Sequence, residues 1–224
     1  MWYKTFLPQL HSIVKPRTYI EIGVRNGYSL SLAPDAMKIA VDPNYSEADM
    51  HYEVGNATFY RMTSDAFFAN CDVGQLMPDG FDLAYIDGMH LFEFALRDFI
   101  NLERYSNRGS VIIVDDVLPR SESEASRTPT GGSWTGDVWK IIPTLVEYRK
   151  DLSDLMILAR SAPTGCLIML NPDANNDVLR KQYDEIVAKY VNNEMTVPSE
   201  EILKQALSAE VALERLALAR IVRS

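Results

Sequence analysis

The stretch from Phe81 to Val117 constrains the fold of this chain most strongly. It holds two apolar runs rich in β-branched residues, separated by an amphipathic helical segment, and each run ends in acid: Asp87 after the first, Asp115 and Asp116 after the second. Successive strands of a parallel sheet point the same way, so these ends meet at one edge, where open α/β sheets bind ligands. Three carboxylates there repel one another, which predicts a divalent cation with oxygen ligands among them.

Composition and charge exclude several classes of protein. The 224 residues carry a net charge of −9, which argues against binding nucleic acid and against docking to anionic membranes. No apolar run approaches the roughly 20 residues that a membrane span needs, and the amino terminus lacks the pattern of a signal peptide. Cys71 and Cys166 provide neither a disulfide framework nor a zinc pattern. We therefore expect a cytoplasmic protein.

Apolar runs alternate with helical segments along the chain. Strands are expected at residues 18–22, 38–41, 60–63, 83–86, 111–114, 155–159 and 166–170. This alternation predicts an α/β fold with a doubly wound, mostly parallel, seven-stranded Rossmann-like sheet and helices on both faces. Residues 1–172 form that domain, and residues 173–224 form a helical C-terminal extension. An apolar stripe predicts a helix over residues 199–222 that either packs on the same compact unit or forms a homodimer.

The turn after the first strand has the pattern Glu21-x-Gly23-x-x-x-Gly27. The glycines allow a tight turn and a close approach of a ligand to the backbone, and the start of the following helix, which includes Ser29, favours an anionic group. The pattern lacks the glycines of a dinucleotide fingerprint, so a smaller zwitterionic ligand is favoured over a pyrophosphate. A plain turn between strand and helix stays open as the alternative.

Two further strand ends carry polar residues. Asp42 ends the second strand at the distance from Gly23 that suits an acid holding both hydroxyls of a ribose. Ser64 and Asp65 end the third strand and can frame an adenine. The alternative for Asp42 is a turn residue, and the alternative for Asp65 is a cap of the next helix.

Together these motifs resemble those of a class I S-adenosylmethionine-dependent methyltransferase. Ile-Asp-Gly-Met-His at 86–90 and Val-Asp-Asp-Val at 114–117 are similar to the metal-dependent O-methyltransferases of the macrocin and catechol types. The resemblance implies a methyltransferase sheet and S-adenosylmethionine as cofactor. Its cofactor-binding residues would be Glu21, Gly23, Gly27, Ser29, Asp42, Ser64, Asp65 and Asp87. Its Mg²⁺ ligands, or those of another divalent cation, would be Asp87, Asp115 and Asp116.

The chemistry of the residues agrees with that resemblance. Methyl transfer to oxygen needs a hydroxyl that is aligned with the methyl donor and stripped of its proton. Magnesium held by carboxylates can bind two neighbouring hydroxyls and lower the pKa of one. His90 lies at the same edge as Asp87, and these two are the expected catalytic residues, with His90 taking the proton. A structural hydrogen bond from His90 to a carboxylate is the equal alternative.

The segment 118–136 is rich in Ser, Thr, Pro and Gly, and such a long loop is typical of a lid or a binding loop. Trp134, Trp139 and Arg120 are its candidate substrate contacts: the indoles can stack on a flat acceptor, and the guanidinium can bind an anionic group. For Trp139 a place in the core is the alternative, and for Arg120 a solvated loop charge.

The sequence thus predicts an S-adenosylmethionine- and magnesium-dependent O-methyltransferase. Its acceptor is a small molecule with vicinal oxygens, such as a sugar or a natural product. A metal-independent N- or C-methyltransferase leaves Asp115 and Asp116 without a role. A nicotinamide-dependent oxidoreductase is disfavoured, because the turn lacks the third glycine of the dinucleotide-binding fingerprint. A non-enzymatic nucleotide-binding module remains the third rival.

Overall fold

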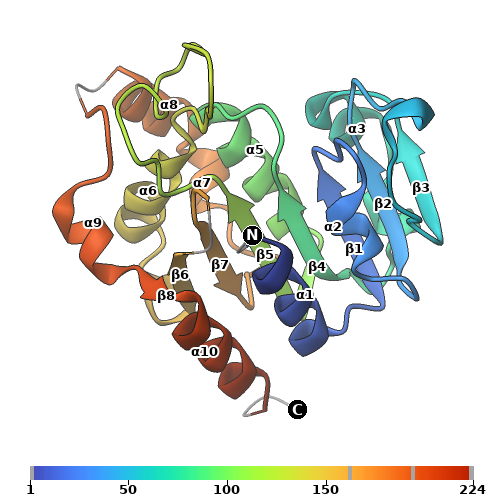
Figure 1. The fold of residues 1–224 in the computed structure, drawn as a ribbon. Coiled ribbons are helices and arrows are strands. Elements are labelled where there is room, and N and C mark those ends of the chain that lie inside the picture. Colours follow the sequence, from blue (N-terminus) through green and yellow to red (C-terminus); the bar gives the residue numbers. More distant parts are fainter. Residues whose placement is uncertain (1–2, 161–162, 193–194, 222–224) are drawn as a thin grey trace.

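A computed structural model describes residues 3–160, 163–192 and 195–221. Within these ranges eight strands form one sheet in the order β3-β2-β1-β4-β5-β7-β6-β8 (Figure 1). The strands are β1 (Thr18–Ile22), β2 (Met37–Val41), β3 (Ala57–Tyr60), β4 (Phe81–Ile86), β5 (Ser106–Asp115), β6 (Met156–Arg160), β7 (Cys166–Leu170) and β8 (Leu207–Ser208). The predicted fold is confirmed. The third strand lies three residues earlier than expected, and β8 is an addition.

Strands β1 to β5 are parallel neighbours, whereas β7 is antiparallel to both β5 and β6. The short connection between β6 and β7 forces this reversal, because parallel neighbours need a long crossover. Residues that follow β1, β2, β4 and β5 consequently come out at one edge of the sheet. That edge carries the candidate site.

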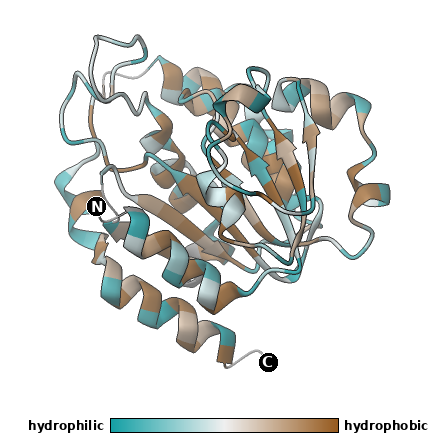
Figure 2. Ribbon diagram, turned by 45° about the vertical axis from the view of Figure 1, so that its right-hand side comes forward, coloured by the Kyte–Doolittle hydropathy of each residue, from teal (hydrophilic) through white to brown (hydrophobic). Residues whose placement is uncertain are grey.

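Helices cover both faces of the sheet, with a separate apolar core on each. One core joins the sheet to α3 (Ser64–Asn70), α4 (Val73–Leu76), α5 (Phe92–Glu103), α6 (Ile141–Tyr148), α7 (Val178–Lys181) and α8 (Tyr183–Val191). The other joins it to α1 (Tyr3–Val14), α2 (Tyr28–Ser31) and α10 (Ala209–Ile221). Figure 2 shows the strands as a mostly hydrophobic layer between helices whose outer surfaces are hydrophilic. Short 3-10 turns lie at Glu47–Asp49, Val138–Lys140 and Lys150–Leu155.

The C-terminal extension packs on both faces of the domain. Helix α8 lies against α5, and α10 lies beside α1 and β6 (Figure 1). The single helix predicted over residues 199–222 is instead α9 (Glu200–Gln205), β8 and α10. The apolar stripe predicted for this segment includes Val211 and Leu218, but both are exposed, and Ala212 and Leu216 of α10 are buried instead. No helix in the described ranges has the length and apolarity that crossing a bilayer requires.

Candidate active site at the carboxyl edge of the sheet

The glycines after β1 are required by close packing. Gly23 has a φ of 87°, and a Cβ there would lie 2.0 Å from the carbonyl oxygen of Asp87. Gly27 has a φ of 78°, and a Cβ there would lie 2.3 Å from the methyl carbon of Met50. Both are left-handed conformations that favour glycine. The turn after β1 is therefore pressed against the loop after β4, which brings two predicted motifs together.

Glu21 lies at the base of this turn and is fully buried. Its carboxylate accepts hydrogen bonds from the Tyr19 hydroxyl at 2.6 Å and the Ser29 hydroxyl at 2.5 Å. Burial raises the pKa of Glu21 to about 8, and the two hydroxyl donors only partly offset that rise. The structure thus places Ser29 and Glu21 in contact, in a setting that favours an added cation near the carboxylate.

Asp42 follows β2 and holds the same turn from the other side. One oxygen, Oδ2, accepts from the backbone N–H of Val24 at 2.9 Å and of Arg25 at 3.2 Å. The other, Oδ1, accepts from the N–H of Asn44 at 2.8 Å. We name Glu21 and Asp42 with these partners the β1–β2 rim. Each oxygen of a carboxylate has two lone pairs, so Asp42 keeps acceptor capacity for a hydroxyl.

Ser64 and Asp65 begin α3, but neither of them caps it. The cap is Thr63, whose hydroxyl accepts from the backbone N–H of Ala66 at 3.2 Å. Asp65 instead receives two hydrogen bonds from Arg97 of α5, at 2.8 Å and 2.7 Å. The capping alternative for Asp65 is therefore wrong. Arg97 was not anticipated from the sequence.

The loop after β4 and the end of β5 bring three ligand-type side chains together. His90 Nε2 lies 3.1 Å from Asp87 Oδ1 and 3.2 Å from Asp116 Oδ2. One ligand atom from each of the three residues lies within 4.8 Å of the others. His90 and Asp116 have φ values of 57° and 62°, an uncommon and strained conformation for residues with a side chain. We name Asp87, His90 and Asp116 the β4–β5 rim.

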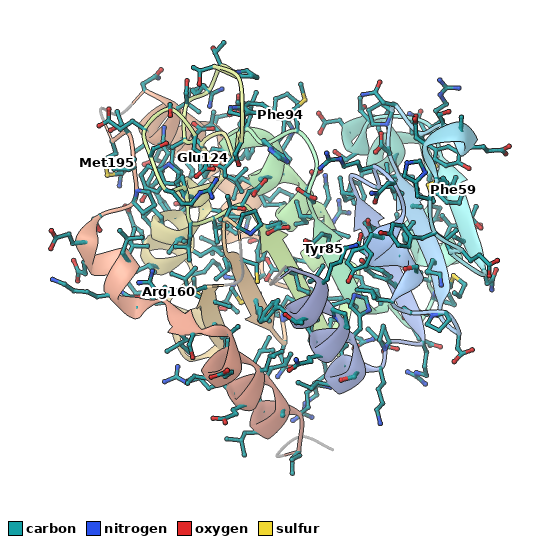
Figure 3. The ribbon with its side chains drawn as sticks, viewed as in Figure 1. Phe59, Tyr85, Phe94, Glu124, Arg160 and Met195 are labelled. Carbon is teal, nitrogen blue, oxygen red and sulfur yellow. The ribbon has the colours of Figure 1, made fainter. Side chains whose placement is uncertain are left out.

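Asp115 lies beside this cluster but is turned away from it. Its carboxylate accepts a short hydrogen bond from the Tyr85 hydroxyl and another from the backbone N–H of Asp116 at 2.9 Å. Thr164 donates a hydrogen bond to Asp116. In this conformation the cluster consists of Asp87, Asp116 and His90, while Asp115 supports it through the backbone. Figure 3 shows Tyr85 in the central part of the sheet.

The charges of the β4–β5 rim depend on one another. Burial raises the pKa of Asp87 and of Asp116 to about 6 each. Burial alone would lower the pKa of His90, but its hydrogen bond to Asp87 and the two negative charges outweigh that effect and raise it to about 9. The imidazolium thus occupies the position between two carboxylates that favours a cation.

The predicted substrate residues divide between the site and the core. Trp134 is at the site: its carbonyl oxygen lies 3.0 Å from His90 Nδ1, and its ring centroid lies 5.3 Å from that of His90. Trp139 has no exposed surface, which agrees with the core alternative. Arg120 pairs with Glu124 within the loop, which Figure 3 shows at the same end of the molecule as Phe94 of α5. Gly136 closes the loop so tightly on His90 that a Cβ would lie 1.6 Å from the His90 carbonyl oxygen.

Under the rim lies a cavity of about 10 Å³, lined by Asp87, His90, Asp98 and Asp115 among others. That volume suits one water molecule. Asp98 of α5 is 2% exposed, and its Oδ1 finds no hydrogen-bond partner within the described residues. Asp98 was not anticipated as a site residue. It lies on the helix face that the sequence predicts to be apolar, and an acid at such a position is the feature that could have identified it.

Comparison with known proteins identifies the class of this fold. Residues 20–117 match a family model described as a methyltransferase domain. TomG, described as an O-methyltransferase from Streptomyces achromogenes in complex with SAM, has a TM-score of 0.53 and 15% identity, over 74% of this chain and 78% of its own. Cofactor-bound Rv0187 from MTB has a TM-score of 0.54 and 18% identity, over 75% and 78%. SAH-bound methyltransferase PaMTH1 of Podospora anserina has a TM-score of 0.53 and 14% identity, over 75% and 77%.

A sequence relative of this chain carries no description of an activity. Uncharacterized protein R132 of Acanthamoeba polyphaga mimivirus is 29% identical over 115 residues, which are 44% of this chain. The chain spans about half, 51%, of the length of that relative. The family match and the strand order agree with the motifs of the sequence. Residues 20–117 of this chain therefore resemble a methyltransferase domain, and the strand order of the sheet is the one found in methyltransferases.

Proposed function

We propose that the protein is an S-adenosylmethionine-dependent, metal-assisted O-methyltransferase acting on a hydroxyl of a small molecule. The observation that carries this proposal is the convergence of Asp87, His90 and Asp116 at the edge of a methyltransferase sheet, next to the turn after β1. Oxygen and imidazole ligands at this spacing suit a divalent cation such as Mg²⁺ or Mn²⁺. A cation bound there would lower the pKa of a chelated acceptor hydroxyl.

Residues of the β1–β2 rim are proposed to hold the cofactor, which supplies the methyl group. Glu21, buried and rich in acceptor capacity, binds the ammonium of its amino-acid end, and Asp42 binds the ribose hydroxyls. Ser64 and Asp65 lie at the start of α3, on the side where the base belongs. Gly23 and Gly27 keep the turn thin, and Ser29 orients Glu21 by donating to it.

His90 is proposed to serve the acceptor in one of two ways. Its Nδ1 faces the carbonyl oxygen of Trp134, which favours a proton on that nitrogen. Its Nε2 faces Asp87 and Asp116, so that loss of the second proton directs a lone pair into the rim. The ring then either ligates the cation or accepts the proton of the acceptor hydroxyl. Asp115 is the further carboxylate that the sequence assigns to the metal, and a rotation away from Tyr85 would bring it in.

The acceptor is proposed to be a small hydroxylated molecule with vicinal oxygens, such as a sugar or a natural product, bound under the loop 118–136. The indole of Trp134 beside His90 supports this, because an aromatic face at the mouth of the site can stack on a flat or cyclic acceptor. The net charge of −9 gives no support to a nucleic-acid acceptor. A homodimer through the C-terminal helices and a cytoplasmic location remain predictions.

The test is calorimetric titration of S-adenosylhomocysteine and of Mn²⁺ into the protein, each in the absence and presence of the other. We expect binding of both, with a single class of Mn²⁺ sites. Binding of the nucleoside by a protein that binds no Mn²⁺ would contradict the metal-assisted mechanism and favour a metal-independent N- or C-methyltransferase. Binding of neither would remove the methyltransferase proposal.

A further inference from the structure

Two adjacent residues of α5 hold two adjacent residues of α3. Arg97 donates from Nε to Asp65 Oδ1 at 2.8 Å and from Nη2 to Asp65 Oδ2 at 2.7 Å. Asp98, the next residue of the helix, is influenced by Ser64, which partly offsets the rise in the pKa of Asp98 that burial causes. Helix α5 begins directly after the Asp87–His90 loop. It therefore connects the β4–β5 rim rigidly to the start of α3.

Arg97 is itself fixed by the C-terminal extension. Its Nη1 donates to the Tyr183 hydroxyl at 2.5 Å, and that hydroxyl donates to the carbonyl oxygen of Glu93 at 2.9 Å. The guanidinium carbon lies 4.4 Å from the centroid of the Phe94 ring. A guanidinium held by hydrogen bonds on one edge and an aromatic ring on one face has little freedom to rotate.

This arrangement fixes the plane of the Asp65 carboxylate. A bidentate pair uses one lone pair on each carboxylate oxygen and leaves the others available. The Asp65 side chain is 44% exposed, so those remaining acceptor sites can meet a ligand. Asp98, by contrast, is 2% exposed and lines the cavity under the β4–β5 rim. Of the two acids near Ser64, Asp65 is therefore the one that can contact a bound base.

We propose that Arg97, secured by Tyr183, is a positioning residue that aims Asp65 at the base of the bound nucleoside and thereby selects an exocyclic amine. The inference rests on the proposed function, from which it takes the nucleoside and the side of the site that holds its base. Adenine carries an amino group at carbon 6, a hydrogen-bond donor. Hypoxanthine carries a carbonyl oxygen there, which a carboxylate repels.

Selectivity has a physical reason, because replacing the amine by a carbonyl changes two contacts with the carboxylate at once. A fixed carboxylate loses its hydrogen bond to the base and gains a repulsive contact when the amine becomes a carbonyl. A hydrogen bond to a charged group contributes about 1.5–3 kcal/mol, or about 10- to 100-fold in affinity. A carboxylate that is free to turn avoids the repulsion and forfeits the bond, so that the preference declines.

The experiment compares S-adenosylhomocysteine with S-inosylhomocysteine by calorimetry. We expect the unaltered protein to prefer the adenosyl ligand by about 30-fold. Lysine cannot form the bidentate pair, so Arg97→Lys weakens the adenosyl ligand by about 10-fold and leaves the inosyl ligand nearly unchanged. Tyr183→Phe removes one hydroxyl and has the same effect at about 3-fold. Arg17→Lys is the control, because Arg17 pairs with Asp82 where β1 and β4 begin, at the opposite edge of the sheet, and both affinities stay unchanged.

The outcomes distinguish failure of this inference from failure of the proposed function. Equal weakening of both ligands by Arg97→Lys and Tyr183→Phe would show a merely structural role and overturn the proposal. Tight binding of the adenosyl ligand with no preference in the unaltered protein would also overturn it, while the proposed function stands. Failure of the unaltered protein to bind either ligand would remove both. If Arg97→Lys does not fold, Tyr183→Phe alone decides, since its preference must fall.

Discussion

The acids of the β1–β2 rim and those of the β4–β5 rim lie at the same edge of one sheet, yet their surroundings differ. Glu21 accepts hydrogen bonds from hydroxyls of β1 and α2, and Asp42 accepts them from backbone amides of nearby loops. Asp87 and Asp116 face one another across a single imidazole, with left-handed backbone at His90 and Asp116. Strained residues of this kind cluster at functional sites because the surrounding structure must hold them.

Acids at the ends of neighbouring strands therefore carry the same charge but differ in the contacts that they make. The acids of the β1–β2 rim already form a hydrogen-bond network within the protein, to which a ligand would be added. The β4–β5 rim is balanced only while His90 is positively charged, so a cation can replace that charge without unfolding anything. On the proposed function, the β1–β2 rim holds the organic cofactor and the β4–β5 rim holds the ion. Substitutions in each rim should therefore have different signatures.

The largest effect is expected at the β4–β5 rim. Asp116→Ala removes one of the carboxylates of the candidate metal site, so methyl transfer should fall by about 10³-fold, or about 4 kcal/mol in the activation barrier. Affinity for S-adenosylhomocysteine should stay within about 3-fold, since Asp116 lies outside the β1–β2 rim. Turnover assays and calorimetry measure the two quantities. Unchanged turnover would contradict the proposed metal.

A second effect is expected below the β1–β2 rim, at His11. This residue is 3% exposed, its ring packs edge-on at 5.3 Å from that of Tyr19, and its ring nitrogens lack partners within the described residues. Burial, with a smaller contribution from Lys38, lowers its pKa to about 4. Between about pH 6.5 and 4 the unfolded state binds more protons, so stability falls as the pH falls, by on the order of 2–3 kcal/mol.

His11→Phe should remove that pH dependence while keeping the shape of the ring. Urea unfolding at pH 7 and pH 4.5 measures the difference for each protein. The pH-dependent loss of the variant should be smaller than that of the unaltered protein. Equal losses would mean that His11 is accessible to protons in the folded state, and that the base of the β1–β2 rim is not closed.

A third substitution separates the two rims directly. Glu21→Gln keeps the shape and the contacts with Tyr19 and Ser29 but cannot carry a negative charge. Because burial already raises the pKa of Glu21 to about 8, stability at pH 7 should change by less than about 1 kcal/mol. Affinity for S-adenosylmethionine should fall by about 10- to 50-fold through the lost ammonium contact. Mn²⁺ affinity is the control and should not change.

The smallest effect is expected from Asp42→Asn. The amide can turn its oxygen toward the N–H groups of Val24 and Arg25, but its NH₂ then faces the N–H of Asn44. The loss of one hydrogen bond should lower the free energy of unfolding by about 1 kcal/mol. Chemical denaturation with and without S-adenosylhomocysteine checks this. A loss as large as that of a buried ion pair would mean that Asp42 supports the turn alone and leaves nothing for a ribose.

The doubly wound, mostly parallel sheet and the edge of it that carries the candidate site were predictable from the sequence. Apolar runs bounded by acid at Asp42, Asp87 and Asp115 mark strand ends, and parallel strands bring such ends together whatever the details of packing. Glycine at 23 was also readable, because a turn between strand and helix at this position needs a left-handed residue. These features depend on local pattern and on the geometry of the sheet.

Side-chain partners were decided only by the tertiary structure. That Asp115 turns to Tyr85, that His90 reaches Asp116 and that Asp65 pairs with Arg97 depends on contacts between segments about 30 residues apart. Trp139 is buried in the core, whereas Trp134, which lies close to it in the sequence, is beside His90. The physical reason is that strand ends are fixed by backbone periodicity, whereas the direction of a side chain depends on its own φ and ψ and on whichever donors the fold brings near.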